Sequence, residues 1–238
     1  MSLKTVPRFE DSDPRYLPTY TLSEASHYLL IPIATLRSWV VGRHYPVREG
    51  KGFFRPPILI SEKSPIMLTF VNLIEAHVLD AVRREFHVPF PKVRSAIAYL
   101  RRQFKSDHPL AEQKIETDGR DIFVRSLGKL IAASRAGQLE MPELVESYLR
   151  RIEWDEFGLA SRLYPFTRKR QPDEPKVIVI DPRISFGRPV LTGTGIRTAI
   201  VAERYKAGES IEELAKDYSR EHLEIEEAIR CELSLEAA

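Results

Sequence analysis

Apolar residues recur along most of this chain at intervals of three and four positions, the period that places them on one face of a helix. The clearest stretch is 68–86, where Phe70, Leu73 and Ile74 keep this spacing and His77 lies on the same apolar stripe. Further stretches with this period begin near Thr21, Pro32, Pro91, Met141, Thr198, Ser210 and His222. The pattern predicts a mainly helical protein in which His77 packs in the core, with the helix at Met141 continuing to about Trp154.

Short segments between these helices have the patterns of strands and tight turns. Two glycines between Val47 and Phe53, and the pair Asp118-Gly119, are each typical of a β-hairpin. The run 176–181 and a second short strand at 190–192 predict another hairpin before the last three helices. We therefore expect an α+β fold, mainly α with small β-hairpins.

Composition divides the chain into four segments. Residues 1–18 predict a flexible arm, and residues 19–154 predict a winged helix-turn-helix and helical domain. Residues 155–175 contain prolines, a basic triplet and few aliphatic side chains, which is typical of a linker. Residues 176–238 predict a second domain, a β-hairpin followed by three helices that again has a helix-turn-helix shape. Ser210 and Glu213 form a capping box at the start of the middle helix.

Residues 20–45 predict two short helices joined by a tight turn. Thr21 and Glu24 form a T-x-x-E capping box, which predicts that the first helix begins directly after Thr21. Pro32 suits the start of the second helix, because its missing N–H has no partner at that position in any case.

The second of these helices has the features of a recognition helix. The side expected to face the core consists of Ile33, Leu36 and Val40. The outward residues are expected to be Ala34, Thr35 and Ser38, with Arg37 and Trp39 at the margins. Small or hydroxylated residues let a helix lie close to DNA, and a marginal arginine reaches a phosphate or a guanine edge. The alternative is an ordinary helical hairpin of an all-α domain, and this pattern alone does not decide between the two.

The predicted hairpin that follows is basic. Its cations are Arg43, Arg48, Lys51 and Arg55. A hairpin beside a helix-turn-helix is a wing, and cations on it lie over the sugar–phosphate backbone, whereas the alternative is a solvated surface loop. These four residues, with Ala34, Thr35, Arg37 and Ser38, are the candidate DNA-binding site.

The net charge of +2 hides an uneven distribution. Residues 1–110 hold 16 Lys and Arg against 10 Asp and Glu, whereas residues 171–238 hold 9 against 14. Because cations on phosphates supply much of nucleic-acid affinity, the first third is the better candidate for binding DNA. The acidic surface of the tail repels phosphates. We therefore expect the tail to bind a protein or to dimerise.

The predicted linker also offers a strip that fits an acidic partner. Tyr164 and Phe166 are expected to be exposed there, beside the cations Arg168, Lys169 and Arg170. Such a strip is able to lie along an acidic protein surface. A plain linker is the default interpretation.

Motifs of common enzymes are absent from the sequence. It has no zinc-protease, nucleophile-elbow, Walker or Rossmann motif, and the glycine-rich loop at 187–195 is interpreted as a turn. A single cysteine excludes an internal disulfide. The sequence has no apolar run long enough for a transmembrane helix, and its first residues do not have the pattern of a secretory signal. We therefore expect a cytoplasmic protein that is not an enzyme and holds no metal or cofactor.

Two segments resemble known families. Residues 20–43, which include Thr35-Leu36-Arg37, resemble the winged helix-turn-helix start of MerR-like regulators, where a Thr-Leu-Arg stretch opens the recognition helix. The tail contains the runs Ile180-Asp181-Pro182-Arg183-Ile184, Gly187-Arg188-Pro189-Val190, Gly193-Thr194, Gly208-Glu209-Ser210-Ile211-Glu212-Glu213-Leu214 and Asp217-Tyr218. These runs resemble a small domain, formerly of unknown function, found in many bacterial antitoxins. With both modules, the chain looks like a long VapB-type antitoxin. It departs from the family where the usual Gly-Thr-Arg-Ile-Pro run reads Gly193-Thr194-Gly195-Ile196-Arg197.

This resemblance implies a partner and a role. The toxins of such type II systems are PIN-domain ribonucleases that cut RNA with clustered acidic residues and Mg²⁺, and an antitoxin blocks that site sterically or with a cation. The candidate toxin-binding residues are Tyr164, Phe166, Arg168, Lys169, Arg170, Arg183, Arg188 and Arg197, with those of the linker preferred. The resemblance also implies autorepression through operator DNA, bound by a homodimer. The alternative is a stand-alone MerR-like transcription regulator whose tail is an oligomerisation module.

Overall fold

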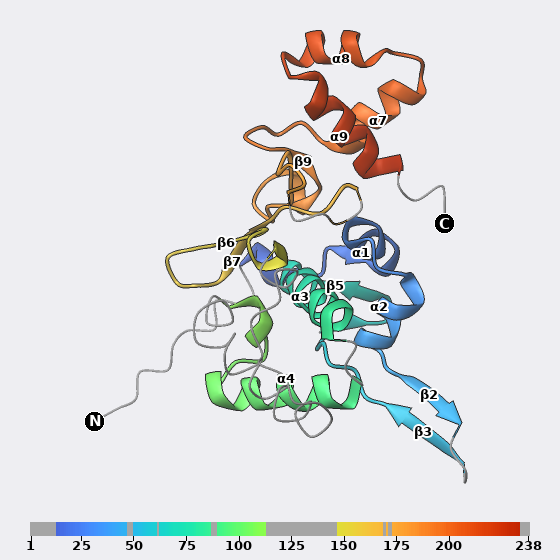
Figure 1. Ribbon diagram of the computed structural model, residues 1–238, viewed down its shortest axis with the longest axis vertical. Helices are drawn as coiled ribbons and strands as arrows, with labels where there is room; N and C mark the ends of the chain where they lie inside the picture. The colour runs from blue at the N-terminus through green and yellow to red at the C-terminus, as the bar shows by residue number, and fades with distance from the viewer. Residues whose placement is uncertain are drawn as a thin grey trace.

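The computed structural model describes residues 13–46, 50–60, 62–86, 90–112, 147–168, 170 and 173–233. Helices dominate, and the strands form small antiparallel sheets, which confirms the α+β prediction. Figure 1 shows the helices of the tail at one end and the N-terminal helices and hairpins at the other. In the described part of the chain, no helix has the length and apolar character needed to cross a membrane.

The N-terminal region begins with a short strand and the predicted pair of helices. Strand β1 (Tyr20–Thr21) leads into α1 (Leu22–Leu29), and α2 (Ile33–Val40) follows. The hairpin β2 (Arg43–Pro46) and β3 (Lys51–Phe54) comes next, as predicted. Strands β4 (Glu62–Lys63) and β5 (Ile66–Leu68) then complete a three-stranded sheet of order β1-β5-β4. Strand β1 of this sheet runs directly into α1, and this connection anchors the helical hairpin to the sheet.

Helix α3 (Phe70–Phe86) is the centre of the N-terminal core, and α4 (Phe90–Phe104) packs below it in Figure 1. Every residue of α3 from its start to Val82 is buried, including polar ones. The prediction that His77 is a core residue is confirmed: its Nε2 lies 3.0 Å from the carbonyl oxygen of Tyr148. Burial lowers the pKa of His77 to about 3, only partly opposed by that contact.

The helix predicted from Met141 to about Trp154 is wrong at its C-terminal end. Residues 147–149 are helical, and the chain then enters β6 (Ile152–Trp154), which pairs with β7 (Ala160–Leu163). The reason is turn chemistry, because the Asp155 side chain accepts hydrogen bonds from the N–H groups of Phe157 and Leu159, each at 2.9 Å. The predicted start of this helix, and the predicted hairpin at Asp118-Gly119, lie outside the described residues.

The expected exposure of Tyr164 and Phe166 is also wrong. Both side chains are buried, and Phe166 packs against the ring of Tyr148 at 4.7 Å between centroids. The physical reason is Arg151, a buried guanidinium that donates hydrogen bonds to the carbonyl oxygens of Tyr164, Pro165, Glu174 and Pro175. The described part of the segment predicted as a linker is thus held as packed structure. The four-part domain division itself stays a prediction.

The tail has the predicted elements and a hydrophobic core of its own. Strands β8 (Ile178–Val179) and β9 (Val190–Leu191) pair antiparallel. Helices α7 (Thr198–Lys206), α8 (Ile211–Tyr218) and α9 (His222–Leu233) follow, and α8 begins with the predicted Ser210–Glu213 capping box. Apolar side chains from all three helices and both strands form this second core, with Leu214, Ile225 and Val201 fully buried.

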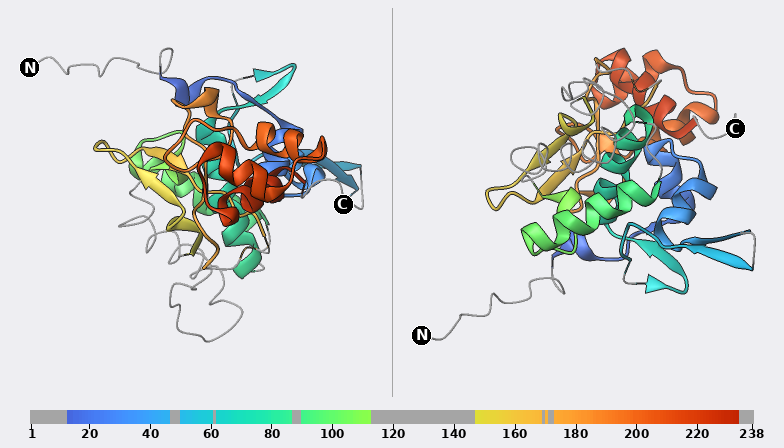
Figure 2. Two further views of the ribbon diagram at one scale, coloured as in Figure 1. Left: turned by 90° about the horizontal axis from the view of Figure 1, so that it is seen from above. Right: turned by 60° about the horizontal axis from the view of Figure 1, so that its bottom comes forward.

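A junction joins the tail to the helix-turn-helix, and α1 is its N-terminal side. The buried Tyr20 hydroxyl donates a 2.9 Å hydrogen bond to the carbonyl oxygen of Gly187. Arg188 forms an ion pair with Glu24 of α1, and Arg170 donates to the carbonyl oxygens of Leu29 and Leu30 at the end of α1. In Figure 2, seen from above, the tail helices accordingly lie over the N-terminal region.

Candidate functional site

The turn between α1 and α2 is tightly specified by local contacts. The predicted capping box at Thr21 and Glu24 is present at the start of α1. Leu30 is the C-cap of α1; it has a left-handed backbone (φ 54°), and its N–H donates to the carbonyl oxygen of His27 at 3.0 Å. The Ser26 hydroxyl donates to the carbonyl oxygen of Ile31 at 2.6 Å, and Pro32 is the N-cap of α2. This turn fixes the angle at which α2 leaves the body of the protein.

The face that α2 presents to solvent differs in part from the prediction. Leu36, Trp39 and Val40 are buried, so the predicted core position of Ile33 and marginal position of Trp39 are both wrong. Ile33 is 51% exposed, because the large ring of Trp39 occupies the core and rotates the buried stripe toward it. Leu36 and Val40 are in the core as predicted.

The predicted outward residues do lie on the solvent side of α2. Ala34 and Arg37 are exposed, and Thr35 and Ser38 are half-buried. The Ser38 hydroxyl is engaged within the helix, because it donates to the carbonyl oxygen of Thr35 at 2.7 Å. The Arg37 side chain makes no hydrogen bond or ion pair with the residues that the structure describes. Its guanidinium is therefore available to a phosphate or a guanine edge.

The β2–β3 hairpin projects from the body beside α2, as the right-hand view of Figure 2 shows. It is anchored at Gly42 (φ 84°), where an added Cβ would lie 2.3 Å from the carbonyl oxygen of Phe54, so only glycine fits. Arg43 and Arg55 at its base are exposed. Arg48 lies outside the described residues, and of Lys51 only the backbone in β3 is described.

Two aromatic residues add to this hairpin, and they were not among the predicted site residues. Tyr45 and Phe53 are both exposed, and Phe53 lies 4.9 Å from the ring of His44 across the strand pair. The pairing of His44 with Phe53 and of Tyr45 with Gly52 places the two aromatic side chains on opposite faces of the ribbon, because side chains alternate along a strand.

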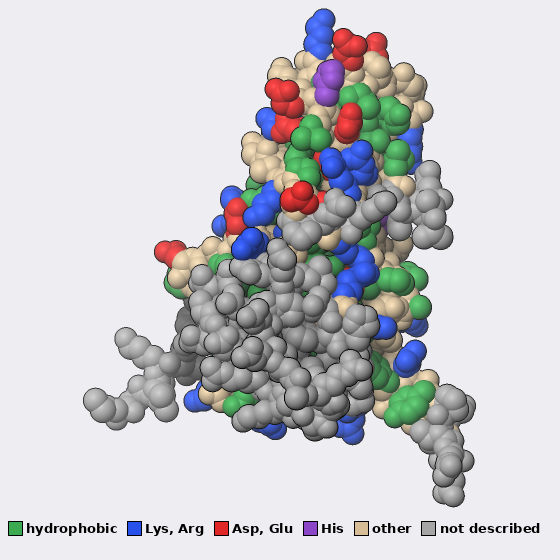
Figure 3. All heavy atoms as spheres, in the orientation of Figure 1, with side chains coloured by type: hydrophobic (Ala, Val, Ile, Leu, Met, Phe, Trp, Pro, Cys, Tyr) green, Lys and Arg blue, Asp and Glu red, His purple; other side chains and the backbone are tan. Residues whose placement is uncertain are grey.

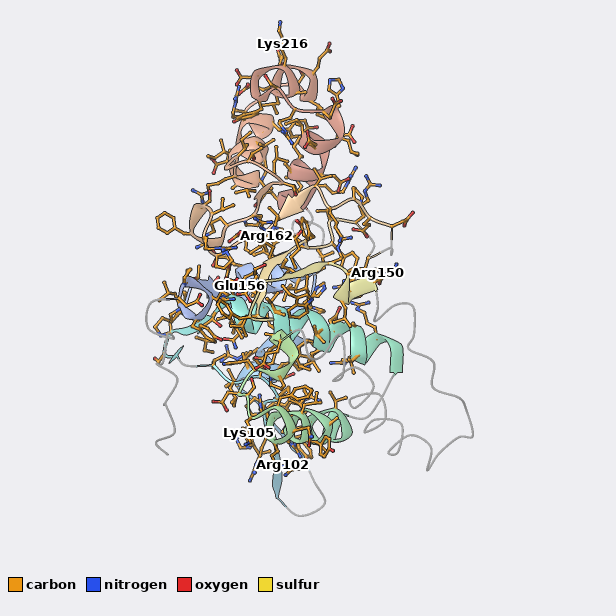
Figure 4. All side chains as sticks on the ribbon, turned by 90° about the vertical axis from the view of Figure 1, so that its left-hand side faces the viewer. Arg102, Lys105, Arg150, Glu156, Arg162 and Lys216 are labelled. Carbon is orange, nitrogen blue, oxygen red and sulfur yellow. The ribbon has the colours of Figure 1, made fainter. Side chains whose placement is uncertain are left out.

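Charge is distributed as the sequence predicted. On the face shown in Figure 3, acidic side chains gather on the tail and the middle of the molecule, whereas the charged side chains visible along its lower right are Lys and Arg. Arg102 of α4 and Lys105, which directly follows this helix, lie at the end opposite Lys216 of α8 (Figure 4). Arg101 is not a simple solvated cation, because it donates to the carbonyl oxygen of Pro57 at 2.7 Å.

Three of the six predicted toxin-binding cations hold the protein itself together. Arg168 donates to the fully buried carboxylate of Glu227 at 2.8 Å. Arg170 and Arg188 are the junction contacts to α1 described above. Lys169 lies outside the described residues. Arg168 and Arg170 of the predicted linker are therefore engaged in internal contacts, because the folded chain supplies the acidic and carbonyl partners that were expected from another protein.

The side chains of Arg183 and Arg197 form no such contact with a distant part of the described chain. Arg183 has 60% of its side chain exposed, although its Nε lies 3.3 Å from Asp181. Arg197 is exposed, and no described residue forms an ion pair with its side chain. Burial raises the pKa of Asp181, but hydrogen bonds from the Arg183 backbone and side chain and from Arg162 outweigh burial and leave this pKa below its usual value.

The junction has its own electrostatic character. Burial lowers the pKa of His27, and the nearby carboxylate of Glu232, 3.9 Å away, opposes this only in part. Burial likewise raises the pKa of Tyr28 to about 12, while its hydrogen bond with Arg188 acts against the increase. Among the described residues no group of three or more His, Cys, Asp or Glu side chains is arranged to hold a metal ion.

Two family models match separate parts of the chain. A family described as "Putative DNA-binding HTH domain" matches residues 18–97, and "Protein of unknown function (DUF433)" matches residues 178–230. The chain is 33% identical over 218 residues to the "Putative antitoxin VapB45" of Mycobacterium tuberculosis, a match covering 85% of this chain and 88% of the relative. It is 28% identical over 220 residues to "Uncharacterized protein Rv2308" of the same organism, with 88% of each chain covered.

A solved structure has the same architecture. The crystal structure of Rv2018 from Mycobacterium tuberculosis superimposes with a TM-score of 0.66 at 30% identity, over 90% of this chain and 98% of the other. Sequence identity above 30% over most of both chains, together with the two matched modules, identifies the family. The chain belongs to the long VapB-type antitoxins, with an N-terminal DNA-binding helix-turn-helix and a C-terminal DUF433 domain.

Proposed function

We propose that this protein neutralises a PIN-domain ribonuclease toxin and represses its own operon by binding operator DNA as a homodimer in the cytoplasm. The observation that carries the DNA half is the solvent face of α2. There Arg37, whose side chain has no partner among the described residues, lies among small side chains, next to a projecting hairpin with exposed Arg43 and Arg55. A recognition helix in the major groove with a wing over the backbone uses this arrangement.

Operator binding is tested with DNA from upstream of the protein's own gene. Arg37→Ala is expected to weaken binding by about 1–3 kcal/mol, the usual contribution of one such contact. Lys216→Ala is the matched control, because this exposed cation lies on α8 at the far end of the molecule. Fluorescence anisotropy at two salt concentrations measures both variants. Binding that is unchanged by Arg37→Ala and insensitive to salt overturns the DNA proposal.

The toxin half is supported by the family and by the separate, acidic tail. Co-expression with the product of the adjacent gene tests it directly. That product is expected to arrest growth alone and to be harmless together with this chain. Arrest that persists in the presence of this chain, or a neighbour without toxicity, contradicts the proposal. Light scattering of the purified chain tests the homodimer.

A stand-alone transcription regulator is the second candidate. It is favoured by the junction, because Arg170 and Arg188 of the expected toxin-binding set instead fasten the tail to α1 of the helix-turn-helix. This function requires no toxin. Retention of operator repression in cells that lack any adjacent nuclease, with no toxin bound in vitro, distinguishes it from the antitoxin.

A further inference from the structure

The loop before β9 holds an aromatic side chain in an unfavourable state. Ser185, Phe186 and Gly187 have consecutive left-handed backbones, with φ of 49°, 56° and 73°. A left-handed backbone is rare for a residue with a large side chain. The side chain of Phe186 is 90% exposed, so burial does not offset the strain. Neither local conformation nor packing within this chain favours phenylalanine at this position.

The surrounding contacts keep this loop in one conformation. The N–H of Gly187 donates to Ile184 at 2.9 Å, and the N–H of Arg188 donates to Ser185 at 3.1 Å. The carbonyl oxygen of Gly187 accepts from the buried Tyr20 hydroxyl at 2.9 Å. Because both ends of the turn are tied, the Phe186 ring is held out in solvent.

A second local misfit lies in the neighbouring loop. Arg197 occupies the N-cap of α7 and makes no capping hydrogen bond. Ser, Thr, Asp and Asn are the residues that cap this position, and a cation there opposes the helix dipole. The Ser185 hydroxyl donates to the carbonyl oxygen of Gly195 at 3.4 Å, so the two loops lie against each other. The two loops that carry residues breaking local rules, Phe186 and Arg197, are therefore in contact.

Charge distinguishes this surface from the rest of the tail. Arg183 and Arg197 are exposed on either side of the loop in sequence. Among the described residues, the ion pair of Arg183 is with Asp181, whose carboxylate is buried. The helices that follow are acidic. We define Arg183, Phe186 and Arg197 as the Phe186 surface, a cationic site with a projecting aromatic ring. Violations of local rules in otherwise consistent structure concentrate at functional sites.

We propose that the Phe186 surface docks an acidic protein, with the Phe186 ring filling an apolar recess of that partner and Arg183 and Arg197 facing carboxylates around it. A rigid aromatic residue beside arginines is the composition of a binding hot spot. The two exposed arginines of the Phe186 surface favour an acidic partner. The candidates are a second copy of the tail and a nuclease with clustered carboxylates, and the nuclease fits better because its carboxylates are concentrated at one site. This inference rests on the proposed function, because the partner is the toxin.

The full-length chain and the purified product of the adjacent gene are the reagents for the test. Isothermal titration is expected to show that Phe186→Gly and Phe186→Ala weaken binding by about 30-fold or more, the range of a hot-spot residue. Arg197→Asp is expected to weaken it by reversing the charge. Phe157→Ala is the matched control, because Phe157 is also exposed but lies on the β6–β7 turn.

Thermal melting separates lost docking from misfolding. Phe186→Gly relieves a left-handed residue and Arg197→Asp supplies an N-cap, so both variants are expected to melt at a higher temperature while binding more weakly. If the wild-type chain does not bind the product, both the proposed function and this inference are overturned. If it binds, and Phe186→Gly binds equally well, only the inference is overturned. If the wild-type chain is a dimer and Phe186→Ala is a monomer, a second copy of the chain occupies the Phe186 surface, and the inference of a toxin at this surface is overturned.

Discussion

Replacing Arg151 tests how the segment between the β6–β7 hairpin and the tail is held. The guanidinium is 2% exposed and donates to Tyr164 at 2.7 Å, Glu174 at 2.9 Å, and Pro165 and Pro175 at 3.2 Å each. It also lies 4.3 Å from the centre of the Phe166 ring. Arg151→Met retains much of the side-chain length and removes every donor.

The magnitude follows from the acceptors that are left behind. Four buried carbonyls lose a donor, at about 1 kcal/mol or more each, and the cation–π contact adds about 1 kcal/mol. Part of this is offset, because the variant no longer buries a charge. Burial lowers the pKa of Arg151, opposed by Glu174 and Glu227, which indicates that this charge is held at a cost. The net loss of unfolding free energy is expected to be about 3–5 kcal/mol, because this offset cancels only part of the loss of the hydrogen bonds and the cation–π contact.

Urea unfolding followed by the fluorescence of buried Trp39 measures this loss. Trypsin digestion gives a local measurement, because Arg168 and Arg170 lie inside the segment that Arg151 holds. The variant is expected to be cut there faster. Arg102→Met is the control, since this exposed cation on α4 is expected to change stability by about 0.5 kcal/mol or less. A loss below about 1 kcal/mol for Arg151→Met, with unchanged cleavage, refutes the reasoning.

Three further predictions concern the junction, a buried ion pair and the face of α2. Gly187→Ala places a Cβ 2.3 Å from the Tyr20 hydroxyl at a φ of 73°, so thermal melting is expected to show a loss of about 2 kcal/mol or more; an unchanged melting temperature contradicts this. Burial lowers the pKa of His108, but its hydrogen bond with Glu75 and the charge of that carboxylate raise it above the ordinary 6.5. The pair therefore stabilises the fold fully below about pH 6.5, and this stabilisation is lost as the pH rises through the raised pKa of His108. In urea unfolding, the difference in stability between the wild-type chain and His108→Gln is expected to shrink toward alkaline pH. A difference that does not change with pH contradicts this prediction. Ile33→Ser is expected to change stability by about 0.5 kcal/mol or less, because the side chain is exposed, and a loss of 2 kcal/mol places it in the core.

Local sequence signals predicted the elements that frame the candidate site. Two capping boxes, at Thr21 and at Ser210, marked the starts of α1 and α8. The two glycines between Val47 and Phe53 predicted the β2–β3 hairpin, and the apolar periodicity of the tail predicted α7–α9. These signals succeed because a cap or a turn depends on interactions within three or four residues of the chain.

The errors came from residues whose partners are distant in sequence. Ile33 and Trp39 both fit a helical wheel, and only the space available beside α3 decided which of them is buried. The segment around Phe166 has the composition of a linker, yet Arg151 and His77 give it a core position through contacts across the fold. No pattern in the sequence marked Phe186, whose unusual backbone depends on the Tyr20 contact from the other end of the chain.

The sequence by itself thus determined the helix-turn-helix, the wing, the helices of the tail and the separation of basic and acidic halves, since each depends on neighbouring residues or on composition. The tertiary structure decided which arginines contact distant parts of the chain. Arg168, Arg170 and Arg188 look equivalent to Arg183 and Arg197 in sequence. Folding places Arg168 beside the buried carboxylate of Glu227, Arg170 beside carbonyl oxygens at the end of α1, and Arg188 beside the half-buried carboxylate of Glu24. A charge is committed or available according to what folding places beside it, and that is a property of long-range packing.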